Sequence, residues 1–176
     1  MKLLAIAVML MAVAQAGAGE PVIITKNLTL KKNAILHTPL VIGADGVTID
    51  GNGATIQGPG KAGDRKSFVG VGVESRGRSN VTIRNLKVRG FATGLVASKG
   101  AKWRIEGCDF SDNYHDPDHG WGDGPRYGGI ILTGISQSVL RTNRACRVWN
   151  GLDLRECNDN LIENNTIKGD TEFGVK

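Results

Sequence analysis

Aromatic residues, cysteine and proline are all scarce in this chain of 176 residues. Aromatic side chains make up 5% of the sequence, which also contains 3 Cys and 5 Pro. Five prolines are too few for a proline-rich linker, and three cysteines permit at most one disulfide, so a disulfide framework is not expected. The chain has no apolar run of the ~20 residues that span a bilayer. An apolar fraction of 40% with 22% charged residues nevertheless excludes a disordered chain.

Residues 1–18 have the three parts of a secretory signal peptide. Lys2 supplies the positive charge, residues 3–13 supply an uncharged apolar core, and residues 16–18 supply the small-residue pattern that signal peptidase cleaves. The apolar core is too short for a transmembrane anchor, so we predict none. We therefore predict a mature chain that begins near Gly19 and is secreted or periplasmic.

The chain carries a mild excess of positive charge, with 22 Lys plus Arg against 17 Asp plus Glu. No basic run interleaved with aromatic residues accompanies this excess, so nucleic acid is not an expected partner. A basic excess spread over an extended surface favours acidic partners such as uronic-acid polysaccharides, although an ordinary solvated surface has the same composition.

A repeat of 22 residues runs through the sequence. Segments that alternate apolar and polar residues around Asn or Gly recur, and their aligned apolar residues are Ile49, Ile83, Ile105, Leu140 and Ile162. The steps between these residues are 34, 22, 35 and 22, so two of the copies carry insertions of 12 and 13 residues. Self-similarity at a fixed period is the signature of a repeat architecture.

The glycines follow the same period. Gly72, Gly94, Gly129 and Gly151 each begin a short alternating strand, again at steps of 22, 35 and 22. Glycine at this point is expected where a turn needs a positive φ or where two backbones approach closely. The alternation that follows predicts strands with one buried face.

Equivalent residues of a stacked repeat lie ~4.8 Å apart, so a column of them should show matched chemistry. The residues that follow the five aligned apolar positions are all charged and alternate in sign: Asp50, Arg84, Glu106, Arg141 and Glu163. A second column has the same alternation: Lys87, Asp109 and Arg144. These columns predict the register of the stack more than its stability, because an exposed ion pair is worth about 0–1 kcal/mol.

The period and the short strands predict an all-β fold, a right-handed parallel β-helix (a solenoid) with rungs of about 22 residues and two loop insertions. Leucine-rich repeats have a similar period but require a Leu-x-x-Leu-x-Leu frame that is missing here. The rungs, the stretch at residues 49–56 (IDGNGATI) and the stretch at residues 160–167 (NLIENNTI) resemble the pectate-lyase-like superfamily of right-handed parallel β-helix proteins, which includes carbohydrate-binding and sugar-hydrolase repeat domains. The resemblance covers residues 22–176, and we predict one β-helix domain over residues 19–176. Because the last rung is incomplete at Lys176, we expect this domain to be the N-terminal part of a longer solenoid.

The two insertions, near residues 57–68 and 114–127, leave the solenoid at the same turn. One uninterrupted rung separates them, so their roots should stand roughly 10 Å apart on one edge. Long loops on a rigid scaffold are where a binding site is expected.

The second insertion concentrates ionisable residues. We predict that its acid, base and cationic groups are catalytic: His115, Asp118, His119 and Arg126. Side chains of the same loop and of the next rung are predicted to bind the substrate: Trp121, Trp149, Asp153 and Arg155. Proton abstraction beside a sugar carboxylate needs a base, an acid and a cation, and these residue types supply them. The stretch at residues 116–119 (DPDH) also resembles the Asp-Pro-His-acid motif of alginate C5-epimerases on this fold, with Asp and His transposed.

Two other interpretations of the second insertion stay open. It is also consistent with a polar excursion that its own hydrogen bonds hold in place, or with a metal site for Ca²⁺, Zn²⁺ or Cu²⁺ without a specific ligand spacing. The cofactor is therefore unknown, with Ca²⁺ one candidate. At the level of function, the leading hypothesis is an exported protein that binds or processes an acidic polysaccharide as a lyase or C5-epimerase. The alternative is a non-catalytic scaffold or a periplasmic accessory protein, with a role in metal delivery as one version.

Overall fold

The computed structural model describes residues 19–116, 126–168 and 173–175. The predicted signal peptide and three of the predicted site residues, Asp118, His119 and Trp121, lie outside the described residues.

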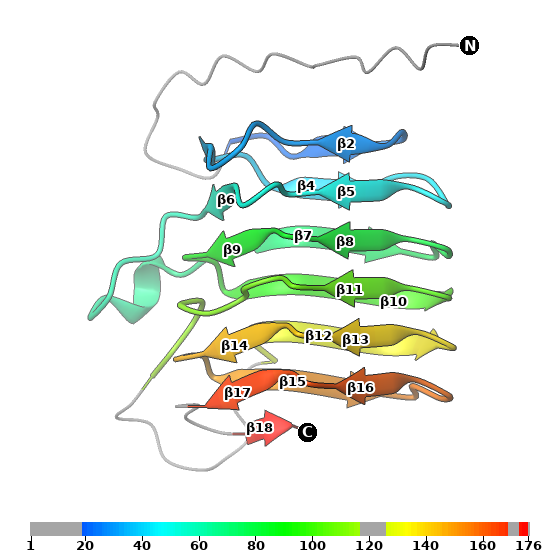
Figure 1. The fold of residues 1–176 in the computed structure, drawn as a ribbon. Coiled ribbons are helices and arrows are strands. Elements are labelled where there is room, and N and C mark those ends of the chain that lie inside the picture. Colours follow the sequence, from blue (N-terminus) through cyan, green and yellow to red (C-terminus); the bar gives the residue numbers. More distant parts are fainter. Residues whose placement is uncertain (1–18, 117–125, 169–172, 176) are drawn as a thin grey trace.

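Short parallel strands stack in successive rungs and form three sides of a solenoid (Figure 1). The longest side is a sheet of seven strands: β1 (Val22–Ile24), β4 (Leu40–Ile42), β7 (Val71–Arg76), β10 (Thr93–Ala101), β12 (Gly128–Ser136), β15 (Asn150–Arg155) and β18 (Phe173–Val175). The second side has six: β2 (Leu28–Thr29), β5 (Thr48–Asp50), β8 (Thr82–Arg84), β11 (Arg104–Glu106), β13 (Val139–Arg141) and β16 (Leu161–Glu163). The third side comprises β3 (Ile35–Leu36), β6 (Thr55–Gln57) and β9 (Lys87–Arg89), then β14 (Arg144–Cys146) and β17 (Thr166–Lys168).

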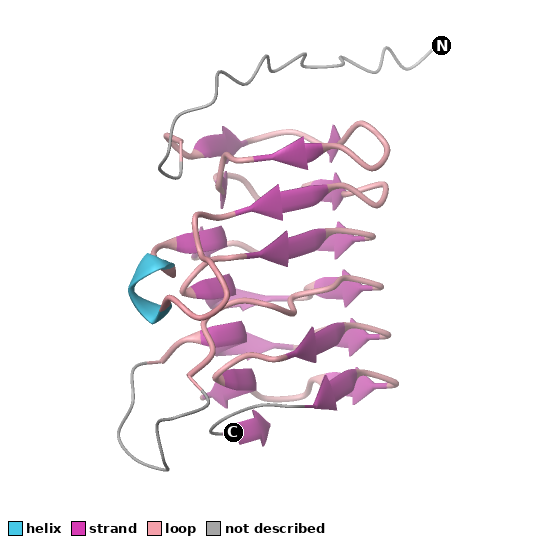
Figure 2. Cartoon of the chain, turned by 90° about the vertical axis from the view of Figure 1, so that its left-hand side faces the viewer, coloured by secondary structure: helices cyan, strands magenta, loops and turns pink. Residues whose placement is uncertain are grey.

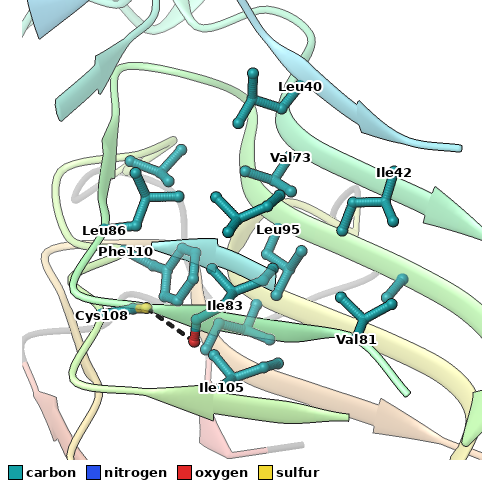
Figure 3. Close-up of a cluster of buried hydrophobic side chains, with 14 of the residues drawn as sticks. Leu40, Ile42, Val73, Val81, Ile83, Leu86, Leu95, Ile105, Cys108 and Phe110 are labelled. Carbon is teal, nitrogen blue, oxygen red and sulfur yellow. Dashed lines mark hydrogen bonds between the residues drawn. The ribbon is translucent and has the colours of Figure 1, made fainter. Parts of the chain in front are cut away.

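The predicted register is confirmed strand by strand. Ile49, Ile83, Ile105, Leu140 and Ile162 are successive partners on the second side of the solenoid. The first four side chains are at most 1% exposed, whereas Ile162 in the last of these strands is 39% exposed. A side chain in an inner rung has an equivalent apolar neighbour both above and below, and this contact along the axis forms the core (Figure 3).

Close packing at the corner before the longest sheet explains the periodic glycines. A Cβ atom on Gly72 would lie 2.2 Å from a side-chain carbon of Val88, and one on Gly129 would lie 2.7 Å from the carbonyl oxygen of Gly151. A Cβ atom does not lie this close to another heavy atom in real structures. Glycine is therefore required at these positions because neighbouring atoms approach its backbone closely, not because φ is positive.

The turns between rung sides use the left-handed backbone region at equivalent positions. Asn52, Asn85, Thr142 and Asn164 have φ between 50° and 55°, and Gly107 has φ 60° at the same turn. Asparagine tolerates this region better than other residues with side chains, which explains its recurrence in the repeat.

The main charge column forms ion pairs along the axis. Arg84 lies 2.9 Å from Asp50, and Arg141 lies between Glu106 at 3.3 Å and Glu163 at 3.7 Å. The second column has the predicted register, with Asp109 paired between Lys87 and Arg144.

The ion pairs of the second column differ from the prediction. Asp109 bonds Arg89 at 2.9 Å instead of Lys87 or Arg144. The planar guanidinium of Arg89 donates to this carboxylate and also reaches Asp112 at 3.7 Å, a geometry that a lysine ammonium does not offer.

Candidate functional site

The two insertions meet on one edge of the solenoid, as the sequence predicts (Figure 2). The first contains a short 3₁₀ helix, η1 (Arg65–Ser67). Arg65 pairs with the buried carboxylate of Asp116 at 2.5 Å, and the ring of Phe68 lies edge-on to Tyr114 with 6.3 Å between centroids. An ion pair and an aromatic contact therefore join the two loops.

Local hydrogen bonds shape the first insertion. The hydroxyl of Ser67 accepts a bond from the Lys61 amide at 2.8 Å and donates to the Asp64 carbonyl at 2.5 Å. A Cβ atom at Gly60 would lie 2.4 Å from the Phe68 ring, so glycine lets that ring fold back against the loop. The loop thereby forms one wall of a hollow.

An open groove of about 550 Å³ lies between the first insertion and the turns of the next rungs. Its lining includes Arg65, Phe68, Arg89, Asp112, His115 and Arg147, and we call it the arginine groove. The Arg65, Arg89 and Arg147 side chains are 51%, 36% and 57% exposed. Three guanidinium groups and one imidazole therefore face a space large enough for part of a polymer chain.

Alternating charges cross the floor of the groove from rung to rung. Nε of Arg147 donates to Oδ1 of Asp112 at 2.6 Å, and Nη1 of Arg89 lies 3.7 Å from the other oxygen of that carboxylate. Gly90, Asp112 and Arg147 occupy the same turn of successive rungs with φ of 73°, 60° and 54°. The turn column thus brings Asp112 between two arginines.

Local contacts shift the pKa of Arg147 in the groove and of Asp109, which binds the groove residue Arg89. Burial alone would raise the pKa of Asp109, but hydrogen bonds from Ser111 and Arg89 lower it. The hydrogen bond to Asp112, together with its negative charge, raises the pKa of Arg147. The lowered pKa keeps Asp109 ionised at neutral pH, and the raised pKa keeps Arg147 cationic there.

Arg126, Asp153 and Arg155 lie together on the outer face of the longest sheet. Nε and Nη2 of Arg126 donate to the two Asp153 oxygens at 2.8 and 2.9 Å, and Nη1 donates to Thr133 at 3.2 Å. Asp153 points outward, as predicted from the buried Leu152 beside it, yet its side chain is 0% exposed. This burial corrects the prediction that Asp153 contacts substrate: its carboxylate binds Arg126.

Trp149 is also placed differently from the prediction. It is 1% exposed and packs edge-on against Tyr114 with 6.0 Å between ring centroids. A buried ring cannot stack on a sugar, so the predicted substrate contact of Trp149 is wrong. Tyr127, 36% exposed and 5.1 Å from Tyr114, is the exposed member of this aromatic cluster.

The structure divides the predicted site residues between two places. His115 lines the arginine groove, whereas Arg126 and Arg155 surround Asp153 on the outer face of the longest sheet. Arg155 is 49% exposed and lies 3.6 Å from the Asp153 carboxylate.

Sequence reasoning did not single out the groove residues Arg65, Arg89, Asp112 and Arg147. A signal for two of them was present, because Gly90, Asp112 and Arg147 are separated by the repeat steps of 22 and 35 residues. The column formed by Gly90, Asp112 and Arg147 therefore predicts that Asp112 and Arg147 lie in neighbouring rungs.

In residues 19–116, 126–168 and 173–175, no three His, Cys, Asp or Glu side chains are grouped so that they could hold a metal ion. Within the same ranges, no helix has the length and apolar character needed to cross a bilayer.

Comparison with known proteins supports the architecture. Residues 25–176 match the family model described as a right handed beta helix region. Searches of curated proteins and of solved structures gave no match.

Proposed function

Because the chain belongs to the family of right-handed β-helix regions, we propose that it binds an acidic polysaccharide in the arginine groove. One observation carries this proposal: Arg65, Arg89 and Arg147 expose their guanidinium groups to a single open groove of about 550 Å³. Guanidinium groups bind carboxylates through two parallel hydrogen bonds, which favours a uronic-acid polymer over a neutral one.

The walls of the groove suit a sugar chain. Phe68 offers an apolar surface for the carbon–hydrogen face of a pyranose ring, and Gln57 adds an amide group to the lining. The rigid solenoid holds these groups at rung spacing, so little ordering is needed when a polymer binds.

A lyase or C5-epimerase reaction would use His115 as the base. His115 lines the groove beside the arginines, and in such a reaction its imidazole removes the proton from C5 next to the sugar carboxylate. The arginines stabilise the negative charge that develops on that carboxylate. Return of a proton to the opposite face inverts C5; elimination of the C4 oxygen, which takes up a proton, leaves a C4–C5 double bond. Asp118 and His119 remain candidates for the second proton-transfer group.

Export follows from the proposed signal peptide at residues 1–18, which would deliver the protein to the periplasm or the medium, where such polymers occur.

Binding is tested by calorimetry with polygalacturonate, alginate and polyglucuronate, each beside its methyl-esterified form. We expect the wild type to bind at least one free acid and not its ester. Arg89→Gln should weaken binding about tenfold, the loss of roughly one charge-assisted hydrogen bond. Arg76→Gln is the matched control, because Arg76 is exposed on β7 and does not line the groove. Absence of binding to every polymer would overturn the proposal.

Turnover is tested on the polymers that bind, by absorbance of unsaturated products and by exchange of the C5 proton with deuterated water. We expect His115→Ala to abolish either signal while binding is kept. Binding without turnover in the wild type would instead favour the non-catalytic scaffold.

A further inference from the structure

We propose that Asp112 is an internal competitor for the substrate: its carboxylate occupies, between Arg89 and Arg147, the place that a sugar carboxylate takes when the polymer binds. This inference rests on the proposed function of the arginine groove. It makes Asp112 a specificity-determining residue that separates polymers from small free acids.

The contacts of Asp112 leave part of the arginine pair unused. Its carboxylate accepts a bond from Arg147 at 2.6 Å but lies 3.7 Å from Arg89, beyond hydrogen-bond distance. Arg89 donates to Asp109 through Nη2 at 2.9 Å, whereas its Nη1 makes only the longer contact of 3.7 Å with Asp112. The two guanidinium groups therefore retain donor capacity for a second carboxylate.

Asp112 is also easier to displace than the neighbouring carboxylates of Asp109 and Asp116. Its side chain is 35% exposed, against 20% for Asp109 and 5% for Asp116. Asp109 accepts further bonds from Ser111, which hold it in place. An ion pair as exposed as Asp112 with Arg147 contributes at most about fivefold to an equilibrium constant, so little stability is lost when a ligand replaces it.

Displacement of Asp112 has a consequence for selectivity. A monomeric uronic acid brings one carboxylate and exchanges one ion pair for another, which yields little net affinity. A polymer adds contacts to Phe68 and Arg65 elsewhere in the groove, and these drive the exchange. Displacing Asp112 costs either ligand the same free energy, so a small acid falls below measurable affinity while the polymer, with its additional contacts, still binds.

The test compares Asp112→Asn with Asp64→Asn by calorimetry on polygalacturonate and on monomeric galacturonate. Asparagine keeps the shape of Asp112 and tolerates its φ of 60°. Asp64 is exposed in the first insertion, and its side chain is not part of the groove lining, so its variant removes the same charge without touching the arginine pair.

We expect Asp112→Asn to bind polygalacturonate about fivefold more tightly than the wild type and Asp64→Asn to stay within about twofold. Monomeric galacturonate should become a measurable ligand only for Asp112→Asn. Asp112→Gly is the second variant should the first not fold, because Gly90 occupies the same turn one rung earlier with φ 73°.

The outcomes separate this inference from the proposed function. If the wild type binds and Asp112→Asn is no tighter than Asp64→Asn, the competitor role is wrong and the binding function stands. If only the Asp112 variants bind, Asp112 blocks the site, and the proposed function of the wild type fails while the competitor role is supported. If no variant binds, both are overturned.

Discussion

The buried carboxylate of Asp153 makes a quantitative prediction about Arg126. Replacing Arg126 with methionine removes two charge-assisted hydrogen bonds of 2.8 and 2.9 Å from a side chain that is 0% exposed. Among the described residues, Arg155 also pairs with Asp153, with its Nε 3.6 Å from the carboxylate. An uncompensated buried charge costs about 3–5 kcal/mol, and because Arg155 compensates part of it, we expect a loss of about 3 kcal/mol in the free energy of unfolding.

Equilibrium unfolding in urea, followed by circular dichroism, measures this loss. Arg155→Met is the matched control: it breaks only the longer contact of a half-exposed side chain, and we expect it to cost about 0–1 kcal/mol. The double variant Arg126→Met with Asp153→Leu should recover most of the stability, because it removes the buried charge as well. The reasoning is refuted if Arg126→Met costs no more than Arg155→Met, or if the double variant is no more stable than Arg126→Met.

Three further predictions concern the core and its thiols. Ile105→Ala should cost about 3–4 kcal/mol in urea unfolding and Ile162→Ala about 1 kcal/mol, because the first side chain is fully buried and the second is 39% exposed; equal losses would contradict a core built by stacking. Asn143→Ala should cost about 2–4 kcal/mol, since the Asn143 side chain accepts from the Cys108 amide at 3.0 Å and donates to the Ile105 carbonyl at 2.8 Å in a buried turn; an effect below 1 kcal/mol would argue against this role. Burial raises the pKa of the Cys108 thiol from 9.0 to about 12, so in the folded protein at pH 8.5 we expect a thiol reagent to modify half-buried Cys157 and spare Cys108, as mass spectrometry would show. The same shift makes stability fall as the pH rises above 9, where the unfolded thiol ionises and the folded one does not.

Much of the fold could be predicted because the sequence period is also a spatial contact. Ile83 and Ile105 are 22 residues apart in the chain and adjacent in the stack, so a pattern read along the sequence identifies residues that touch. The alternating charges at Arg84, Glu106 and Arg141 predicted the register for the same reason. The insertions were visible as departures from the period, and their shared turn predicted that they would leave from one edge of the solenoid.

The contacts of the site could not be predicted in this way because they do not repeat. Alternation along β15 predicted that Asp153 points outward, but its burial depends on Arg126, 27 residues earlier in an irregular loop. Tyr114 and Trp149 are separated by the repeat step of 35 residues, so the period places them in neighbouring rungs, but it does not reveal that the Trp149 ring is 1% exposed. Burial in a loop depends on the particular path of that loop, for which one sequence carries no regular signal.

The sequence by itself determined the solenoid: its rung length, its buried columns, its register and the edge from which both insertions leave. Only the tertiary structure decided which charged groups form a site. Arg65 comes from a folded insertion, Arg89 from a strand end and Arg147 from a turn two rungs further along, and they line one groove only after the rungs stack and the loop folds back. Stacking follows a period that is present in the sequence. Which side chains reach the same groove depends instead on distances that are set only when the chain has folded.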